Sequence, residues 1–117
     1  ISSKDFKDIC DKLLMGKSDV SINIDTQSLT LTSDSTELGI IKHSEPLQGR
    51  IALVKFNTDV NITLSYNSMY SLYMFSTSGD GQCFLGFSNE MPSRLKAILH
   101  DESFIYLYVA PKIVDDE

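Results

Sequence analysis

The chain has 117 residues, with 10 basic and 16 acidic side chains, a formal net charge of -6 and 42% hydrophobic residues. This size and composition predict one domain, residues 1–117, with its own core, and they exclude a disordered chain. No apolar run approaches the roughly 18 residues of a membrane-spanning helix, so we expect a soluble protein with no membrane partner. Because the chain begins with Ile1, we expect it to be a piece of a longer protein.

Five apolar residues of the first segment follow helical spacing, at positions i, i+3, i+4, i+7 and i+8. Either Ser2 or Ser3 can cap this predicted helix, and Gly16 can end it. The apolar stripe consists of Phe6, Ile9, Cys10, Leu13 and Leu14.

The hydrophobic period changes from about 3.6 to two at Val20, which predicts strands. A hairpin is expected first, with its turn at residues 25–28, followed by two further strands. The predicted strands of this half cover residues 20–24, 29–32, 38–43 and 51–56.

The second half of the chain repeats this form. After a strand at residues 60–64, a second helix is expected to place Tyr66, Met69, Tyr70 and Tyr73 on one face, and residues 76–81 close it. Strands are then predicted at residues 82–88, 93–99 and 104–109, with a turn at residues 100–103.

The predicted class is therefore α+β, with a helix-plus-strands unit that occurs twice. We expect two helices packed on one face of a continuous antiparallel sheet. The side chains expected to face that sheet are Phe6, Ile9, Leu13, Met69 and Tyr73.

Three enzyme-like signals have simpler explanations. His100-Asp101-Glu102 is interpreted as a hairpin turn, and residues 78–81 lack the lysine of a phosphate-binding loop. Cys10 and Cys83 belong to no metal-binding or C-x-x-C cluster, so we interpret them as buried thiols in a reducing compartment. We expect no enzyme activity, no metal and no cofactor.

The last residues carry a family resemblance. Residues 106–117 combine a tyrosine-rich strand, Ala110-Pro111-Lys112-Ile113 and an acidic tail. Residues 3–10 contain the spacing Phe-x-x-Ile-Cys, residues 37–39 read Glu-Leu-Gly, and residues 88–92 read Ser-Asn-Glu-Met-Pro. In this order, the motifs resemble the second domain of the eukaryotic sliding clamps of the proliferating cell nuclear antigen family.

The resemblance implies the DNA-clamp fold and a DNA polymerase processivity factor in the nucleus. Members of the family carry two domains per subunit, joined by a connector, and form a homotrimeric ring around double-stranded DNA, independently of its sequence. Replication and repair proteins dock on the ring through clamp-binding peptides. This chain would be the second domain alone, without the first domain and the connector.

By the same resemblance, the C-terminal segment forms one wall of a peptide-binding groove. Pro111 removes a backbone donor and keeps the segment extended, which suits pairing with a partner strand. An ordinary frayed tail is the alternative. The groove residues implied are Tyr108, Ala110, Pro111, Lys112 and Ile113, with Met91 and Pro92 as the second wall.

The resemblance also implies a subunit interface along an edge strand, so we expect the isolated chain to be monomeric or to pair only artificially. This interface would consist of Glu37, Leu38, Gly39, Ile40, Ile41, Lys42 and His43.

Clamps line their central hole with basic helices, because phosphate neutralisation supplies affinity for any DNA sequence. The candidate DNA-facing residues here are Lys4, Lys7 and Lys12, but Asp8 and Asp11 share their helix face. A solvated face with local ion pairs is the alternative for these lysines. The second helix is expected to expose Asn67, Ser71 and Phe75, without any base.

Other functions stay open at this point. A checkpoint-type clamp subunit would share the fold but form a heterotrimer, and a non-clamp α+β domain would serve protein interaction alone. A hydrolase or thiol enzyme would need a convergent polar cluster, and the sequence offers none.

Overall fold

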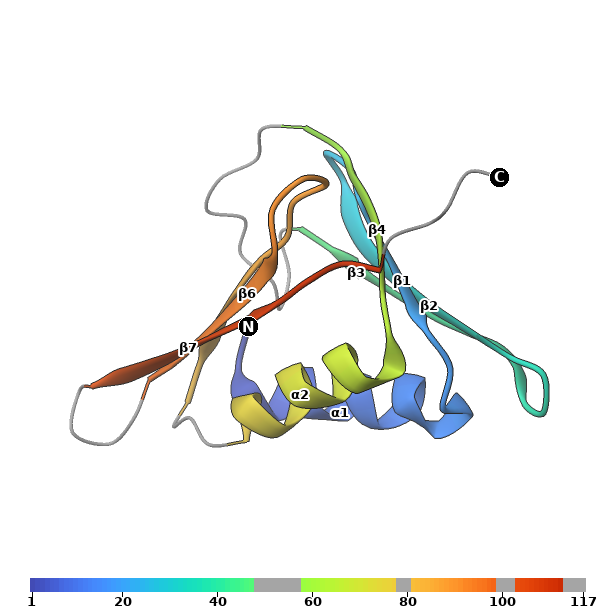
Figure 1. Cartoon of the computed structure of the whole chain (residues 1–117), viewed down its shortest axis with the longest axis horizontal. Coiled ribbons are helices and arrows are strands. Elements are labelled where there is room, and N and C mark those ends of the chain that lie inside the picture. Colours follow the sequence, from blue (N-terminus) through green and yellow to red (C-terminus); the bar gives the residue numbers. More distant parts are fainter. Residues whose placement is uncertain (48–57, 78–80, 99–102, 113–117) are drawn as a thin grey trace.

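The computed structural model describes residues 1–47, 58–77, 81–98 and 103–112 (Figure 1). Two antiparallel sheets form the sides of a wedge, and two helices lie along its base. The chain is therefore α+β, as predicted. No helix in these ranges is long and apolar enough to cross a membrane.

The first helix, α1 (Ser3–Leu13), agrees with its predicted stripe. Ser2 is the capping residue, because its hydroxyl oxygen accepts a hydrogen bond from the Asp5 backbone N–H at 3.0 Å. A 3₁₀ turn, η1 (Leu14–Gly16), ends the helix, and Lys17 then takes a left-handed conformation with φ 52°. The stripe from Phe6 to Leu14 is buried, as expected.

The first sheet has the strand order β3-β2-β1-β4 in the described part of the chain. The predicted hairpin is confirmed, and the Asp25 carboxylate closes its turn by accepting N–H bonds from Gln27 and Ser28 at 2.8 and 2.9 Å. The third strand continues past His43 to Pro46, which an edge strand tolerates. The strands are β1 (Val20–Ile24), β2 (Ser28–Ser35), β3 (Gly39–Pro46) and β4 (Val60–Leu64).

The second unit begins with α2 (Tyr66–Ser76). Ser65 caps this helix, because its hydroxyl oxygen accepts a hydrogen bond from the Ser68 N–H at 3.2 Å. The strand order of the second sheet is β5-β6-β7 among the described residues. Its strands are β5 (Cys83–Gly86), β6 (Ser93–Ile98) and β7 (Phe104–Val109). The strand expected at residues 51–56, and residues 100–102 of the expected turn, lie outside the described residues.

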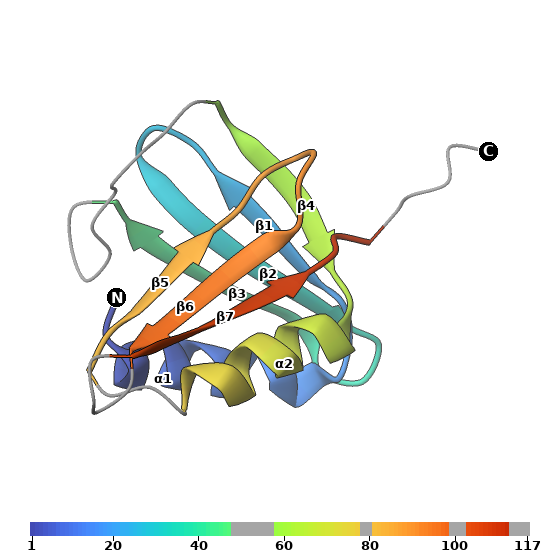
Figure 2. The same cartoon turned by 60° about the vertical axis from the view of Figure 1, so that its left-hand side comes forward.

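The described strands form two sheets, so the expectation of one continuous sheet with both helices on one face is wrong for this part of the chain. Helix α2 follows β4 and carries the chain along the base, so β5 starts on the other side of the wedge (Figures 1 and 2). Helix α1 contacts β2 and β3, whereas α2 contacts β4, β6 and β7. The helices thus close the space between two sheets.

The core fills this space with side chains from both helices and both sheets. Phe6, Ile9, Leu13 and Met69 are buried as predicted, and Tyr73 is half-buried. Tyr70, expected on the buried face of α2, is exposed, and Leu72 is fully buried instead. Tyrosine keeps its hydroxyl in water while its ring packs sideways, so its spacing is a poor guide to the core face.

Candidate functional site

The C-terminal segment leaves β7 and crosses to the first sheet. The Lys112 N–H donates to the Thr63 carbonyl oxygen of β4 at 2.7 Å, and the Lys112 ammonium pairs with Asp19. The side chains of this ion pair are about half exposed and add little stability, but the backbone bond fixes the course of the segment. Residues 110–112 are therefore docked and not frayed, whereas Ile113 lies outside the described residues.

A hollow of about 530 Å³ lies beside this segment. Its floor is the outer face of β1 and β4, and the loop that precedes β6 forms the far side. The lining residues are Ser21, Asn23, Asn61, Ile62, Thr63, Asn89, Glu90, Pro111 and Lys112.

The structure thus brings two expected groove residues, Pro111 and Lys112, to the same hollow as the loop at residues 88–92. The loop contributes Asn89 and Glu90 to the lining, in place of the expected Met91 and Pro92. Met91 is 66% exposed, and Tyr108 and Ala110 are also exposed. The floor of the site is accordingly more polar than the apolar groove that we expected.

Asn89 is a site residue that the sequence analysis missed. Its side-chain oxygen accepts from the Asn61 N–H at 2.8 Å, and its amide donates to the Asp59 carbonyl oxygen at 2.8 Å. The Ser88 hydroxyl accepts from the N–H groups of Glu90 and Met91 at 3.2 and 3.3 Å. These bonds hold the loop in a defined turn against β4.

The predicted interface strand lies at the edge of the first sheet among the described strands, as expected. Gly39 begins β3 with φ 81°, a conformation that favours glycine, while Glu37 and Leu38 belong to the preceding turn. Ile40 is 70% exposed, and Lys42 is exposed as well. No described strand pairs with the outer side of β3, and this edge presents apolar surface.

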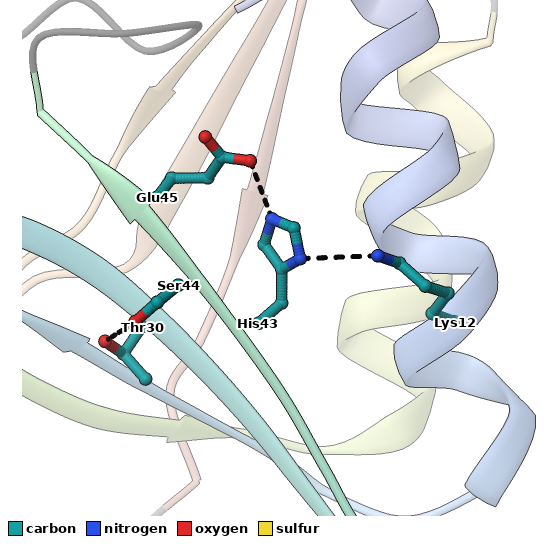
Figure 3. A network of polar contacts seen from close by, with 5 residues as sticks. All are labelled: Lys12, Thr30, His43, Ser44 and Glu45. Carbon is teal, nitrogen blue, oxygen red and sulfur yellow. Dashed lines mark hydrogen bonds and ion pairs between the residues drawn. The ribbon is translucent and has the colours of Figure 1, made fainter.

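His43 connects this edge strand to α1 (Figure 3). Its Nε2 lies 2.7 Å from the buried Glu45 carboxylate, and its Nδ1 lies 3.4 Å from the Lys12 ammonium. Because an ammonium only donates, this geometry assigns the ring proton to Nε2, which donates to Glu45. Lys12 therefore points toward β3 and is engaged with the sheet.

The remaining helix lysines are exposed but their charge is balanced. Lys7 pairs with Asp11 at 3.2 Å, and the hydrogen bond and charge of Asp11 raise the pKa of Lys7. Helix α1 carries three lysines and three aspartates, and α2 carries no charged residue. On α2, Asn67 is exposed as expected, whereas Ser71 and Phe75 are half-buried. The helix layer thus has no net positive charge with which to attract phosphate.

Both cysteines are buried free thiols, as interpreted from the sequence. Burial is the main cause that raises the pKa of Cys10 and of Cys83, so the reactive thiolate is scarce near neutral pH.

We expect both thiols to resist a thiol reagent at pH 8 in the native protein, because their pKa values are raised and reagent access is blocked. Both should react at once in denaturant. A colorimetric thiol assay with and without guanidinium checks this, and fast native labelling of Cys10 would contradict the observed burial.

Within the described ranges, no group of three or more His, Cys, Asp or Glu side chains could hold a metal ion. No family model and no curated protein matches this chain.

Proposed function

We propose that this chain is the second domain of a sliding-clamp subunit. In the complete protein, the domain would form part of a homotrimeric ring that encloses double-stranded DNA in the nucleus. It would act without catalysis, as a processivity factor and a docking platform for DNA polymerase and other proteins with clamp-binding peptides. The observation that carries this proposal is the Ala110-Pro111-Lys112 segment, which leaves a tyrosine-rich strand and lies docked beside the loop at residues 88–92.

Preorganisation of the two walls supports peptide docking. The Lys112 backbone bond to Thr63 holds the segment, and Asn89 holds the facing loop. A partner peptide would therefore meet surfaces that lose little conformational entropy on binding. Met91 follows the lining residue Glu90 in the loop and is 66% exposed, so it offers apolar area to an aliphatic or aromatic anchor.

The outer side of β3, with which no described strand pairs, supports assembly into a ring, because a strand from a neighbouring subunit can extend the sheet there. The neutral helix layer is compatible with a ring that retains DNA by enclosing it. Accordingly, we propose that Lys4 and Lys7 contribute at most weak, salt-sensitive contacts to DNA.

The same neutral layer favours a second candidate, an α+β interaction domain that binds such peptides without enclosing DNA. The two candidates share the docking site and differ in whether the complete protein is retained on circular DNA.

A calorimetric titration tests the docking site. We expect a peptide with a short helical turn, one aliphatic anchor and two aromatic anchors to bind the intact chain. Deleting residues 110–113 should weaken binding at least about tenfold, because this removes one wall of the hollow and the backbone that an extended partner pairs with. Pro111→Ala should cost less, since it changes preorganisation more than contacts.

Asp19→Asn is the matched control. It removes the ion pair of Lys112 but leaves the backbone bond to Thr63, so binding should stay within about twofold. Circular dichroism of each variant verifies folding. Equal affinity of the intact and the deleted chain would place peptide docking elsewhere on the molecule.

A further inference from the structure

The outer face of the second sheet carries aromatic rings around two basic side chains. Strand alternation turns Cys83, Leu95 and Ala97 toward the core, and the neighbouring positions toward solvent. Figure 2 shows this sheet in front of the first sheet. We name this surface the aromatic-basic face; its residues are Phe84, Arg94, Lys96, Phe104, Tyr106 and Tyr108.

The strand register sets the two cations in the middle of this face. Lys96 of the central strand lies opposite Phe84 on one side and Tyr106 on the other. Its ammonium is 4.4 Å from the Phe104 ring centroid, 5.8 Å from that of Tyr106 and 5.9 Å from that of Phe84. The Arg94 guanidinium is 5.9 Å from the Tyr106 ring centroid.

The rings of β7 form a row. Ring centroids of Phe104 and Tyr106 are 5.3 Å apart, and those of Tyr106 and Tyr108 are 6.3 Å apart with planes inclined by 24°. A hollow of about 240 Å³ opens beside the row, and it is lined by Phe84, Arg94, Lys96 and Tyr106. The face thus combines flat π surfaces, two fixed positive charges and a depression between them.

The local charge of the aromatic-basic face indicates which kind of ligand it can bind. The whole chain has a net charge of -6, yet the outward-facing positions of the described strands β5, β6 and β7 carry Arg94 and the half-buried Lys96 and no carboxylate. The face also lacks the amide and carboxylate side chains that would hydrogen-bond sugar hydroxyls. Its chemistry therefore complements a ligand that has both flat rings and negative charges.

We propose that the aromatic-basic face binds single-stranded nucleic acid. Unpaired bases would stack on Tyr106 and its neighbouring rings, while Arg94 and Lys96 neutralise the phosphates. Duplex DNA cannot bind in this way, because its bases are stacked on one another and expose no ring face. This binding site is separate from the peptide-docking hollow and does not depend on the clamp proposal.

Fluorescence anisotropy of a labelled 12-nucleotide oligo-dT tests the proposal. We expect saturable binding that weakens as salt rises, because two cations displace counterions from the strand. Tyr106→Ala should weaken binding about tenfold, since base stacking on one aromatic side chain has an effect of this order. The double variant Arg94→Ala/Lys96→Ala should weaken binding and flatten the salt dependence.

Tyr70→Ala is the matched control, because Tyr70 and Tyr106 are both 43% exposed but Tyr70 lies on α2. It should leave oligo-dT affinity unchanged. We leave Tyr108 intact in all variants, because the family resemblance also implies a role for it in peptide docking. All substituted residues are exposed or half-buried, and urea unfolding verifies that each variant is folded.

Three outcomes would overturn the proposal. The first is no binding of oligo-dT at low salt, and the second is equal weakening by Tyr70→Ala and Tyr106→Ala. The third is equal or tighter binding of a duplex, or of vesicles with anionic lipid, which would make the face a general polyanion or membrane surface. Peptide binding by Tyr106→Ala should remain normal, so a failure here is distinguishable from a failure of the docking proposal.

Discussion

Leu72→Ala should lower the free energy of unfolding by about 2–5 kcal/mol, because it leaves a cavity where α2 meets both sheets. Leu72 is fully buried, and α2 contacts strands of each sheet. Urea unfolding measures this loss, and the dependence of the unfolding free energy on urea concentration should stay the same as in the unchanged chain. Met74→Ala is the control, since Met74 lies two residues further along the helix and is exposed.

Met74→Ala should change the free energy of unfolding by about 0.5 kcal/mol or less. If the Leu72→Ala variant does not fold, Leu72→Val should still show a smaller loss of the same sign. Equal stability of the Leu72 and Met74 variants would contradict the observed orientation of α2.

Gly16→Ala should destabilise the chain by about 1–3 kcal/mol through overpacking. A methyl group on Gly16 would lie 2.8 Å from Cβ of Ser35 and 3.3 Å from the Ser33 hydroxyl oxygen. Cβ of Ser35 cannot rotate away, so the turn after α1 would have to move from β2. Thermal or urea unfolding measures the effect.

Gly86→Ala is a suitable comparison, because its methyl group would meet Arg94 atoms at ordinary contact distances of 3.7 Å and beyond. A double-mutant cycle tests the contact itself. Gly16→Ala combined with Ser35→Gly should cost less than the two single changes added together, because the clashing Cβ is gone. Strict additivity would show that the cost of Gly16→Ala arises elsewhere.

The sequence predicts α1 well because every local signal agrees there. The apolar stripe and the capping serine mark the helix, and Gly16 lies in the 3₁₀ turn that ends it, although Lys17 takes the left-handed conformation. Strand pairing is different, since the period of two indicates which side chains share a face but not which strands are neighbours. For this reason, the hairpin of β1 and β2 was predictable, whereas the division into two sheets was not.

The close packing of the turn at Gly16 against β2 could not be predicted from the sequence either. Buried positions of β2 change from Leu29 and Leu31 to Ser33 and Ser35, where the turn at Gly16 approaches the strand. Small side chains at these positions let the turn at Gly16 pack against β2. In the sequence, however, a serine in a strand predicts an exposed polar position. The approach of the 3₁₀ turn explains their burial, together with the hydrogen bonds of their hydroxyls: Ser33 bonds to the Ser18 hydroxyl, and Ser35 accepts from the N–H groups of residues 37 and 38.

The hollow that we propose as a docking site was predictable in its C-terminal half only. The motif at residues 110–113 marks the segment, but the Asn89 bonds that hold the facing loop span about 30 positions of sequence. Similarly, the alternation of Phe104, Tyr106 and Tyr108 is visible in the sequence. Their position around Lys96 requires the register of β6 with β7.

Mapping amide chemical shifts during titration with the anchor peptide tests the central claim most directly. We expect shifts that saturate together at the amides of residues 61–63, 89, 90 and 112, which line the floor and the two walls of the hollow. Amides of α1 and of the exposed side of α2 should not move. Saturating shifts confined to the helices or to β5, with residues 110–112 unchanged, would contradict it.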